Sequence, residues 1–457
     1  MGLQAFSLEP KVFPAVETPF RRVRTKIPVP ESVPFFRKLR ASEPRSMHCE
    51  PPVIWEKARG VNVFDPYGNK WLDWSCGVLV TNAGHNHPKI ISALQDYLEK
   101  GGPLHSYIFA NQARAKLVEK LLSIVPRELD RVFLLTTGSE AVEVALKVSR
   151  TAGIRQNPKK RYVISFEGGF HGRTYASQLA GGALGGGEWV DRNPYFVPVP
   201  FPGSIETKDK SFSLFEKSLQ DAGIKPDEVS AVISETFQGR EGKLMPKEYA
   251  VSLREWCNLY QAALIFDEVQ AGFGRTGKLF GFEHCGVVPD LFVCGKGISS
   301  SLPLSAVIGK STYLDLYEPG EMTSTHTGSP LPAVAALASI ETILEENLVE
   351  NADRLGKYLR EQLKKITAPY QNRIDVGGCG LVAGMLFFQD RQSLKPDPES
   401  AFRFCESAVG SGNLFFAPVG KGRGTIKFCP PLCITREAID DGIYGTRGLA
   451  EIIKEVM

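Results

Sequence analysis

The sequence has little net charge, no long apolar run and no paired-cysteine motif. Lysine and arginine number 54 against 51 for aspartate and glutamate, so the net charge of +3 gives no support for nucleic-acid binding. One basic cluster, "RRVRTK" at 21–26, is interpreted as a solvated N-terminal arm. No apolar run reaches the roughly 18 residues that a membrane-spanning helix needs, so no membrane partner is expected.

The nine cysteines are scattered and include no C-x-x-C pair. This pattern argues against a disulfide framework and against a zinc site, and it predicts a reducing compartment. The N-terminal stretch "MGLQAFSLEPKVFPAVETPF" has acidic residues and prolines where a signal peptide has a continuous apolar core. The expected location is therefore the cytoplasm.

With 457 residues, 43% of them hydrophobic, the chain is long enough for two or more domains with large cores. Residues 1–50 are rich in proline and arginine and predict an extended arm. "GVNVFDPYGNKWLDW" predicts two short strands joined by a turn. Short apolar strands then alternate with helical patterns: "RVFLL", "RYVISF", "SAVISE", "AALIFDE", "DLFVCG" and "LSAVIG". Such alternation predicts a mostly parallel sheet covered by helices on both faces.

A long, broken helix is predicted over residues 333–366, followed by strands of a smaller α+β domain in "DVGGCGLVAGMLFF" and "GTIKFCPPLCIT". The predicted division has three parts. Residues 1–87 form the N-terminal arm and part of the small domain, 88–345 the large domain, and 346–457 the rest of the small domain.

Chemically useful residues follow the ends of the predicted strands. Gly138 and Ser139 open a helix after "RVFLL", where free backbone N–H groups, a hydroxyl and the helix dipole suit a phosphate. Phe170 and His171 lie among glycines after "RYVISF", so a flat ligand can approach the backbone. Each pattern alone also fits an ordinary helix cap or tight turn. Ligands of parallel sheets bind where these strand ends meet.

Two charged residues complete this edge. Asp267 ends the apolar strand "AALIFD", so its carboxylate should be nearly buried and needs a cationic partner. Lys296 follows "DLFVCG", and a desolvated lysine there favours the neutral, reactive amine. A phosphate turn, an aromatic plate, a carboxylate and a lysine are what pyridoxal 5'-phosphate requires. The lysine would form a Schiff base, and the carboxylate would keep the pyridine nitrogen protonated.

The same segments resemble the class III pyridoxal-phosphate-dependent aminotransferases, of the ω-aminotransferase type that includes 4-aminobutyrate and acetylornithine enzymes. The resemblance covers about residues 50–455 and includes "GNKWLDWSCGVLVTNAGHNHP", "TTGSEAVEVALKVSR", "GGFHGRT", "FDEVQAGFGRTG" and "TSTHTGSPLPAVAA". It implies fold type I, like aspartate aminotransferase, with a seven-stranded, mostly parallel sheet in the large domain. The cofactor residues that we expect are Gly138, Ser139, Phe170, His171, Glu235, Asp267, Gln270, Lys296 and Thr325.

The resemblance also bears on the substrate. Arg173 matches an arginine that many members use to hold a distal carboxylate of the amino donor. In ω-amino-acid members a glutamate and an arginine form a gate that admits the keto acid; here those positions hold Arg240 and Lys427. Either Glu241 substitutes for the glutamate or the gate is absent. Two cations cannot form that pair. Val78 stands where ornithine-specific members have a tyrosine, which weakens an ornithine assignment.

We therefore predict an aminotransferase that moves an amino group from an ω-amino acid or amine to a keto acid, with Lys296 and Asp267 as catalytic residues and no metal. Thr325 would reach the phosphate of the neighbouring subunit, which implies a homodimer with a shared site; a tetramer is left open. Two alternatives stand beside this prediction. One is an amino-acid racemase, decarboxylase or lyase on the same fold, and the other is a catalytically silent binding protein.

Overall fold

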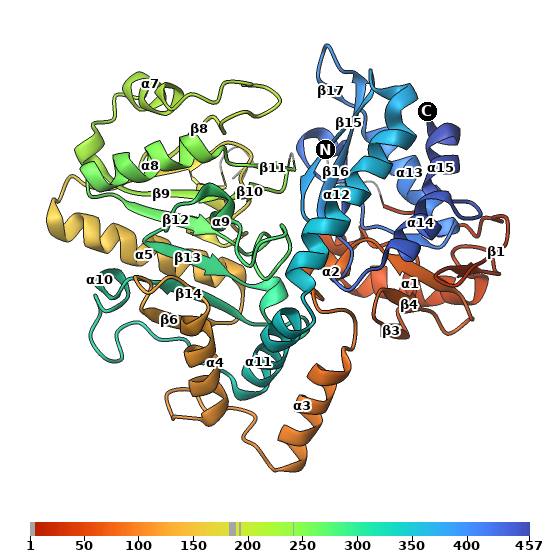
Figure 1. Cartoon of the computed structure of the whole chain (residues 1–457), viewed down its shortest axis with the longest axis horizontal. Coiled ribbons are helices and arrows are strands. Elements are labelled where there is room, and N and C mark those ends of the chain that lie inside the picture. Colours follow the sequence, from red (N-terminus) through yellow and green to blue (C-terminus); the bar gives the residue numbers. More distant parts are fainter. Residues whose placement is uncertain (1–4, 182–188, 192, 241) are drawn as a thin grey trace. The chain divides into compact units, whose positions relative to one another are not determined.

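The computed structural model describes residues 5–181, 189–191, 193–240 and 242–457. The chain forms two compact units (Figure 1). Unit 1 is Met1–His87 with Glu350–Met457, and unit 2 is Pro88–Val349. The arm and the domains that we assigned from the sequence stay predictions, because these units are defined by contacts within the chain.

Unit 2 contains a seven-stranded sheet in the order β6-β14-β13-β12-β9-β7-β8. Strand β14 is antiparallel to both of its neighbours, and the other adjacent pairs are parallel, so the prediction of a mostly parallel sheet is confirmed. The strands are β6 (Arg131–Leu135), β7 (Tyr162–Phe166), β8 (Phe196–Val199), β9 (Val229–Glu235), β12 (Ala263–Asp267), β13 (Leu291–Cys294) and β14 (Ser305–Gly309), with a separate pair β10 (Phe237–Gln238) and β11 (Lys243–Leu244).

Helices pack on this sheet because side chains of a strand alternate between its faces. On one face Ile233, Ile265 and Val293 join the core that α5 covers. On the other face Phe166 meets Tyr249 of α8 edge to face at 6.1 Å. The helices of unit 2 are α3 (Pro88–Glu99), α4 (Gln112–Ser123), α5 (Gly138–Gln156), α6 (Tyr175–Ala180), α7 (Ser213–Asp221), η3 (Pro226–Glu228), α8 (Lys247–Leu259), α9 (Phe282–Cys285), η4 (Lys296–Ile298), α10 (Ser311–Leu314) and α11 (Pro330–Glu345).

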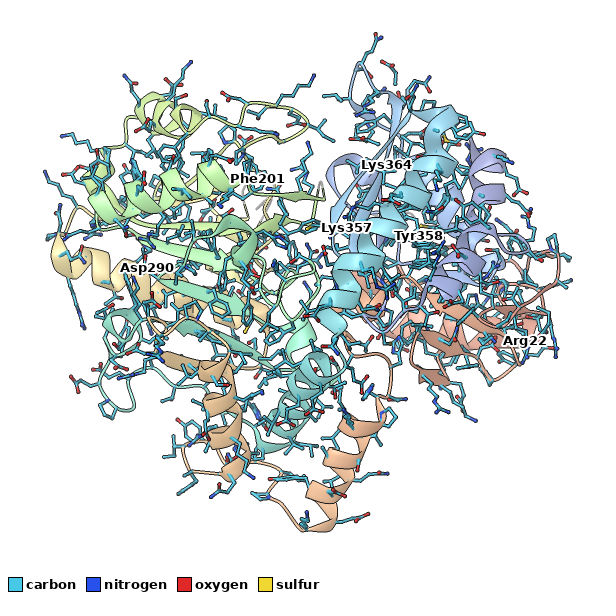
Figure 2. The ribbon with its side chains drawn as sticks, in the orientation of Figure 1. Arg22, Phe201, Asp290, Lys357, Tyr358 and Lys364 are labelled. Atoms are coloured by element: carbon cyan, nitrogen blue, oxygen red, sulfur yellow. The ribbon has the colours of Figure 1, made fainter. Side chains whose placement is uncertain are left out.

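A buried acid, Asp290, lies at the edge formed by the amino ends of the parallel strands. Asp290 lies just before β13, at the amino end of the strand (Figure 2), and its oxygens pair with Arg254 at 2.8 Å and Lys310 at 2.7 Å. It also accepts the backbone N–H of Leu264. The charge of Asp290 is therefore compensated by neighbouring side chains, and a ligand of this sheet is expected at the carboxyl ends of its parallel strands.

Unit 1 is built from short strands and helices. One sheet runs β1-β2-β5-β4-β3 with β18 beside β5, and the other runs β15-β16-β17 with β19 beside β16. The strands are β1 (Val16–Glu17), β2 (Arg22–Val23), β3 (Lys57–Arg59), β4 (Asn62–Phe64), β5 (Lys70–Asp73), β15 (Ile374–Cys379), β16 (Val382–Asp390), β17 (Lys395–Pro396), β18 (Asn413–Leu414) and β19 (Thr425–Phe428). The helices are η1 (Pro30–Ser32), α1 (Val33–Ser42), η2 (Arg45–Met47), α2 (Cys76–Leu79), α12 (Leu348–Thr367), η5 (Ala368–Tyr370), α13 (Pro398–Gly410), η6 (Lys421–Arg423), α14 (Arg436–Tyr444) and α15 (Leu449–Val456).

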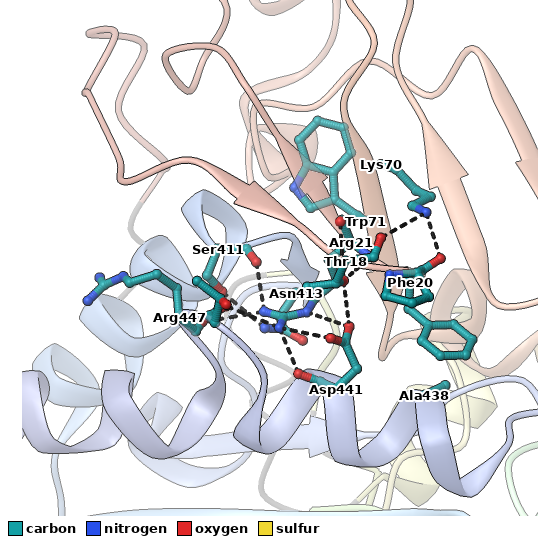
Figure 3. A network of polar contacts seen from close by, with 12 residues as sticks. Thr18, Phe20, Arg21, Lys70, Trp71, Ser411, Asn413, Ala438, Asp441 and Arg447 are labelled. Atoms are coloured by element: carbon teal, nitrogen blue, oxygen red, sulfur yellow. Dashed lines mark hydrogen bonds and ion pairs between the residues drawn. The ribbon is translucent and has the colours of Figure 1, made fainter.

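Two predictions about the start of the chain are wrong in part. Residues 33–42 form helix α1 instead of extended chain; Pro34 is tolerated because an N–H in the first turn has no acceptor inside the helix. The basic cluster is not simply solvated, because Arg21 is fully buried and its Nε donates to the Asp441 carboxylate at 2.9 Å. Its other nitrogens donate to backbone carbonyls, including that of Ser411 (Figure 3).

The predicted break in the long helix is confirmed. Helix α11 ends at Glu345 and α12 begins at Leu348, with Asn347 between them at φ +53°. The predicted strand pair of "GVNVFDPYGNKWLDW" is also confirmed as β4 and β5, which pair antiparallel. Among the helices of the described ranges, none is long and apolar enough to cross a membrane.

Candidate active site

The turn after β6 begins helix α5 with exposed donors. Thr137 accepts the N–H of Glu140, and the Glu140 carboxylate accepts the N–H groups of Thr136 and Thr137. Within the described ranges, no hydrogen bond engages the N–H of Gly138 or Ser139. These amides lie at the positive end of a 19-residue helix, which suits an anion such as phosphate.

The turn after β7 touches this phosphate turn. A methyl group placed on Gly172, which has φ +135°, would lie 2.3 Å from Oγ of Ser139, so only glycine fits there. Next to it the Phe170 ring is 46% exposed, and the guanidinium of Arg173 lies 5.8 Å from the ring centroid. The structure thus places an aromatic plate and a cation beside the anion-binding turn.

Asp267 and His171 form a buried pair. Oδ2 of Asp267 accepts Nδ1–H of His171 at 2.8 Å, and Oδ1 accepts the backbone N–H of Val269 at 3.0 Å. Both oxygens are therefore fixed, and so is the direction of the carboxylate. The prediction that Asp267 would be buried is confirmed, because its side chain is nearly inaccessible to solvent; its partner His171 is a cation when the imidazole is protonated.

The charge on this pair follows from its surroundings. Burial lowers the pKa of His171, but the hydrogen bond with Asp267 and the negative charges of Asp267 and Glu235 raise it, and the net pKa lies above its ordinary value. When the imidazole is protonated, it forms an ion pair with the Asp267 carboxylate. The second ring nitrogen, Nε2, is buried and has no hydrogen-bond partner among the described residues, so this corner of the site suits a polar ligand.

Lys296 lies directly after buried strand β13, at the start of the short helix η4. It is half-buried and has φ +43°, a left-handed conformation that is uncommon for a residue with a side chain and costs of order 1 kcal/mol. Such a backbone persists only where its surroundings hold it. The surrounding structure therefore holds Lys296 in an unfavourable backbone conformation at the carboxyl edge of the sheet.

Val269 brings these segments together. A methyl group placed on Gly138 would lie 3.0 Å from its Cγ1, and one on Gly295 would lie 3.6 Å from the same atom. The phosphate turn, the residues after Asp267 and the lysine segment therefore meet at one side chain. An anion-binding turn, an aromatic plate, an ionised acid and a lysine within one unit are what pyridoxal phosphate needs, so the residues fit this cofactor.

The remaining predicted residues of unit 2 support the loops. Glu235 is buried and accepts the N–H of Phe170 at 3.1 Å, so it fixes the segment that carries the aromatic plate. The Gln270 side chain packs against Gly239, where an added methyl group would lie 2.2 Å from its nitrogen. The Arg240 guanidinium packs against the turn at Gly168, where an added methyl group would lie 2.7 Å from one of its terminal nitrogens.

Other predicted residues are not brought to this group by the structure. Thr325 is exposed on the segment before α11. Val78 is exposed in α2 and Lys427 lies in β19, both in unit 1, so their part in the site stays a prediction. Glu241 lies outside the described residues.

Our reading of the sequence missed three residues at the carboxyl edge. Val269 joins the segments described above, and Glu268 is a fully buried acid that binds the Thr236 hydroxyl. The sequence held one signal for Glu268, because a second acidic residue follows Asp267 at the end of an apolar strand. No pattern in the sequence pointed to Val269 or Thr236.

A mostly parallel sheet of this order, with a lysine and a buried carboxylate at its carboxyl edge, defines the class of pyridoxal-phosphate enzymes of fold type I. The family model described as aminotransferase class-III matches residues 44–447. The chain is 32% identical over 415 residues to a 5-aminovalerate aminotransferase of Pseudomonas aeruginosa, covering 89% of this chain and 95% of the relative. It is 32% identical over 416 residues to a 4-aminobutyrate aminotransferase of Escherichia coli, covering 88% and 94%.

Solved structures agree with this. A transaminase from the marine bacterium Virgibacillus matches with a TM-score of 0.81 at 27% identity, covering 93% of this chain and 99% of that one. The ornithine aminotransferase of Toxoplasma gondii matches with a TM-score of 0.78 at 27% identity, covering 93% and 94%. The chain belongs to the class III aminotransferase family. It is an enzyme that depends on pyridoxal phosphate and transfers an amino group from a donor to a keto acid.

Proposed function

We propose that this enzyme takes the amino group of an ω-amino acid, such as 4-aminobutyrate or 5-aminovalerate, and transfers it to a keto acid. The observation that carries the proposal is the position of Arg173. Its guanidinium lies 5.8 Å from the exposed Phe170 ring, so a donor whose amine reaches the site can place its distal carboxylate on a cation. The names of the Pseudomonas and Escherichia relatives support the same class of donor.

Within this proposal, the chain's residues hold the cofactor in distinct ways. Gly138 and Ser139 would bind its phosphate, Phe170 would cover its ring, and Gln270 would lie near its ring hydroxyl. Asp267 would face its pyridine nitrogen, with His171 and Glu235 fixing the carboxylate and the aromatic segment. The bound cofactor supplies an electron sink for the carbon that loses a proton.

Lys296 is the proposed covalent anchor and the proposed acid–base group. Its Nζ would hold the cofactor, be displaced by the amine of the donor, and then carry the proton between two carbon atoms. Its left-handed backbone fixes where the side chain starts. The Asp267 carboxylate is held in one direction because His171 donates to Oδ2 and Val269 donates to Oδ1.

We also propose a homodimer in which Thr325 reaches the phosphate of the partner subunit. Large apolar side chains are exposed on α3 and in the segment that follows it: Leu98, Leu104, Ile108 and Phe109. The hydroxyl of Tyr107 in that segment bonds Thr323, two residues before Thr325. A second copy covering these side chains supports the proposal, because monomers rarely expose contiguous apolar patches. The scattered cysteines of the sequence, which include no C-x-x-C pair, support a reducing, cytoplasmic location.

The preference for a charged substrate is proposed from the positive charges of Arg240 and Lys427. Arg240 and Lys427 stand where other members have a glutamate and an arginine, and Val78 stands where ornithine enzymes have a tyrosine. Arg240 is half-buried against the turn at Gly168, so it would act through that turn as well as by its charge. We propose that these cations favour a substrate with at least one carboxylate over a neutral monoamine.

The test compares donors. Purified enzyme is assayed with 5-aminovalerate, 4-aminobutyrate and an uncharged monoamine, each with pyruvate or 2-oxoglutarate as acceptor. Arg173→Ala should raise KM for the two amino acids about ten- to hundredfold and leave the monoamine nearly unchanged. Arg155→Ala, at the far end of α5, is the matched control. Equal effects on charged and uncharged donors would refute the carboxylate anchor.

The reaction type has its own test. A racemase, decarboxylase or lyase on this fold would convert a single amino acid without a keto acid. Product analysis with and without the acceptor, including chirality and released carbon dioxide, separates these reactions from transfer. Turnover that persists without any keto acid would favour the alternative. The silent binding protein is the weaker alternative, because the family consists of enzymes.

A further inference from the structure

Glu268 is a buried acid that the proposed function does not use. Its side chain is fully inaccessible to solvent, and burial together with the neighbouring charge of Asp267 raises its pKa to about 8 against the lowering effect of its hydrogen bonds. Oε1 accepts the Thr236 hydroxyl at 2.5 Å and the N–H of Phe282 at 3.0 Å. Oε2 accepts the N–H of Gly281 at 2.6 Å.

These three bonds join three separate segments. Thr236 directly follows Glu235 at the end of β9, and Gly281 and Phe282 begin α9. Glu268 itself directly follows Asp267 at the end of β12. One carboxyl group therefore ties together two strand ends and a helix start at the carboxyl edge.

The same group closes a loop at its base. Residues 269–280 leave the sheet after Glu268 and return at Gly281, where its carboxylate binds the backbone. This loop begins with Val269, which contacts the phosphate turn, and with Gln270, which packs against Gly239. Packing at the closure is tight: a methyl group on Gly281 would lie 2.3 Å from the Thr236 hydroxyl oxygen and 3.1 Å from Oε1 of Glu268.

Burying a carboxyl group costs several kcal/mol unless hydrogen bonds compensate it, and an apolar side chain would fill the space without that cost. The acid at position 268 is therefore explained by the segments that its three hydrogen bonds hold together. We propose that Glu268 is a positioning residue that fixes the direction of the Asp267 carboxylate and the position of Gln270 by tying the base of the 269–280 loop to β9 and α9. The inference rests on the role proposed above for Asp267.

The test separates the effect of the length of the Glu268 side chain from the effect of its acidic group. Glu268→Asp keeps the acid but shortens it by one methylene, so it cannot span all three donors. Glu268→Gln keeps the length: its carbonyl can accept from Gly281 while its amide donates to the Thr236 oxygen, and the Phe282 N–H loses its acceptor. Glu283→Gln, on the same short helix, is the matched control, because its carboxylate is exposed and binds the N–H of Phe280.

Each variant is loaded with pyridoxal phosphate. Three properties are measured below the unfolding temperature: cofactor affinity, the pH midpoint of the bound cofactor's absorbance change, and kcat and KM with 5-aminovalerate and 2-oxoglutarate, or with whichever donor the wild type turns over. Thermal midpoints are recorded separately.

Glu268→Asp should shift the absorbance midpoint and lower kcat about ten- to hundredfold, because a displacement of about 1 Å at a reacting group has that effect. KM should change by less than about threefold, since binding contacts remain. Glu268→Gln should recover most of kcat, and Glu283→Gln should match the wild type. If Glu268→Asp does not fold, Thr236→Val removes one of the three bonds and should change the same properties in the same direction by a smaller factor.

Two results would overturn the inference. One is a set of variants that lose only thermal stability while the absorbance midpoint and kcat stay as in the wild type. The other is normal kcat in Glu268→Asp together with a loss in Glu268→Gln, which would assign the effect to the acid and not to its reach. Asp267→Asn is measured alongside: normal turnover in that variant would instead remove the role of Asp267, and the two failures are thus distinguishable.

Discussion

Two adjacent arginines of the N-terminal segment give a direct test of burial. Arg21 pairs with Asp441 at 2.9 Å and is fully buried, whereas Arg22 pairs with Glu17 at 2.8 Å and remains in contact with solvent. The ion-pair distances are almost the same, so the surroundings alone separate the two pairs. We expect Arg21→Leu to destabilise unit 1 and Arg22→Leu to have little effect.

The magnitude follows from what the change leaves behind. Without the guanidinium, the Asp441 carboxylate keeps the Thr18 hydroxyl but loses its bond to Arg21, and the carbonyl oxygen of Ser411 loses its Arg21 donor (Figure 3). The carbonyl oxygen of Thr446 loses its Arg21 donor as well. Removing one partner of a buried pair costs about 3–5 kcal/mol. At a typical urea dependence of about 1–3 kcal/mol per M, the unfolding midpoint should fall by about 1–5 M.

The assay is urea unfolding followed by tryptophan fluorescence. Trp71 lies in the same unit, and its indole N–H donates to the carbonyl of Val409, so it reports on this region. Asp441→Asn should lower the midpoint as well, because it leaves the Arg21 charge unpaired. Equal midpoints for the Arg21 and Arg22 variants would show that burial of this network does not stabilise the fold.

Three further predictions concern the site. Lys296→Ala should abolish turnover and the fixation of cofactor mass by borohydride, as seen by peptide mass spectrometry; label on another lysine in the wild type would contradict the assignment. His171 has a pKa raised above its ordinary value of 6.5, so the stability that it adds is complete below that pH and is lost as pH rises through its folded pKa. The difference in unfolding free energy between the wild type and His171→Gln should therefore shrink as the pH of urea titrations rises from about 6 to 9, and a constant difference would exclude the imidazolium form. Ser339→Ala leaves the buried Ser300 hydroxyl, 2.7 Å away, without this partner, and should cost about 1–3 kcal/mol in the same unfolding assay; an unchanged midpoint would show that the hydroxyl pair does not stabilise the segment after Lys296.

The sequence by itself determined the alternation of strands and helices and most of the strand-end residues. Short continuous apolar runs such as "AALIFD" that alternate with helical patterns are typical of buried parallel strands, and residues that end parallel strands meet at one edge of the sheet. Asp267, Lys296 and the phosphate turn could therefore be found without coordinates. A break in the long helix of residues 333–366 was predicted as well, and the structure places it between Glu345 and Leu348.

Only the tertiary structure decided which residues touch one another. His171 finds Asp267 across 96 positions of sequence, and Arg21 finds Asp441 across 420, because pairing depends on strand order and register and not on local spacing. Helix α1 was missed because its proline reads locally as a breaker, although the first turn tolerates it. Glu268 and Val269 were passed over for the same reason: a side chain between a carboxylate and a loop acquires its role from contacts that the neighbouring strands β9 and β13 bring to it.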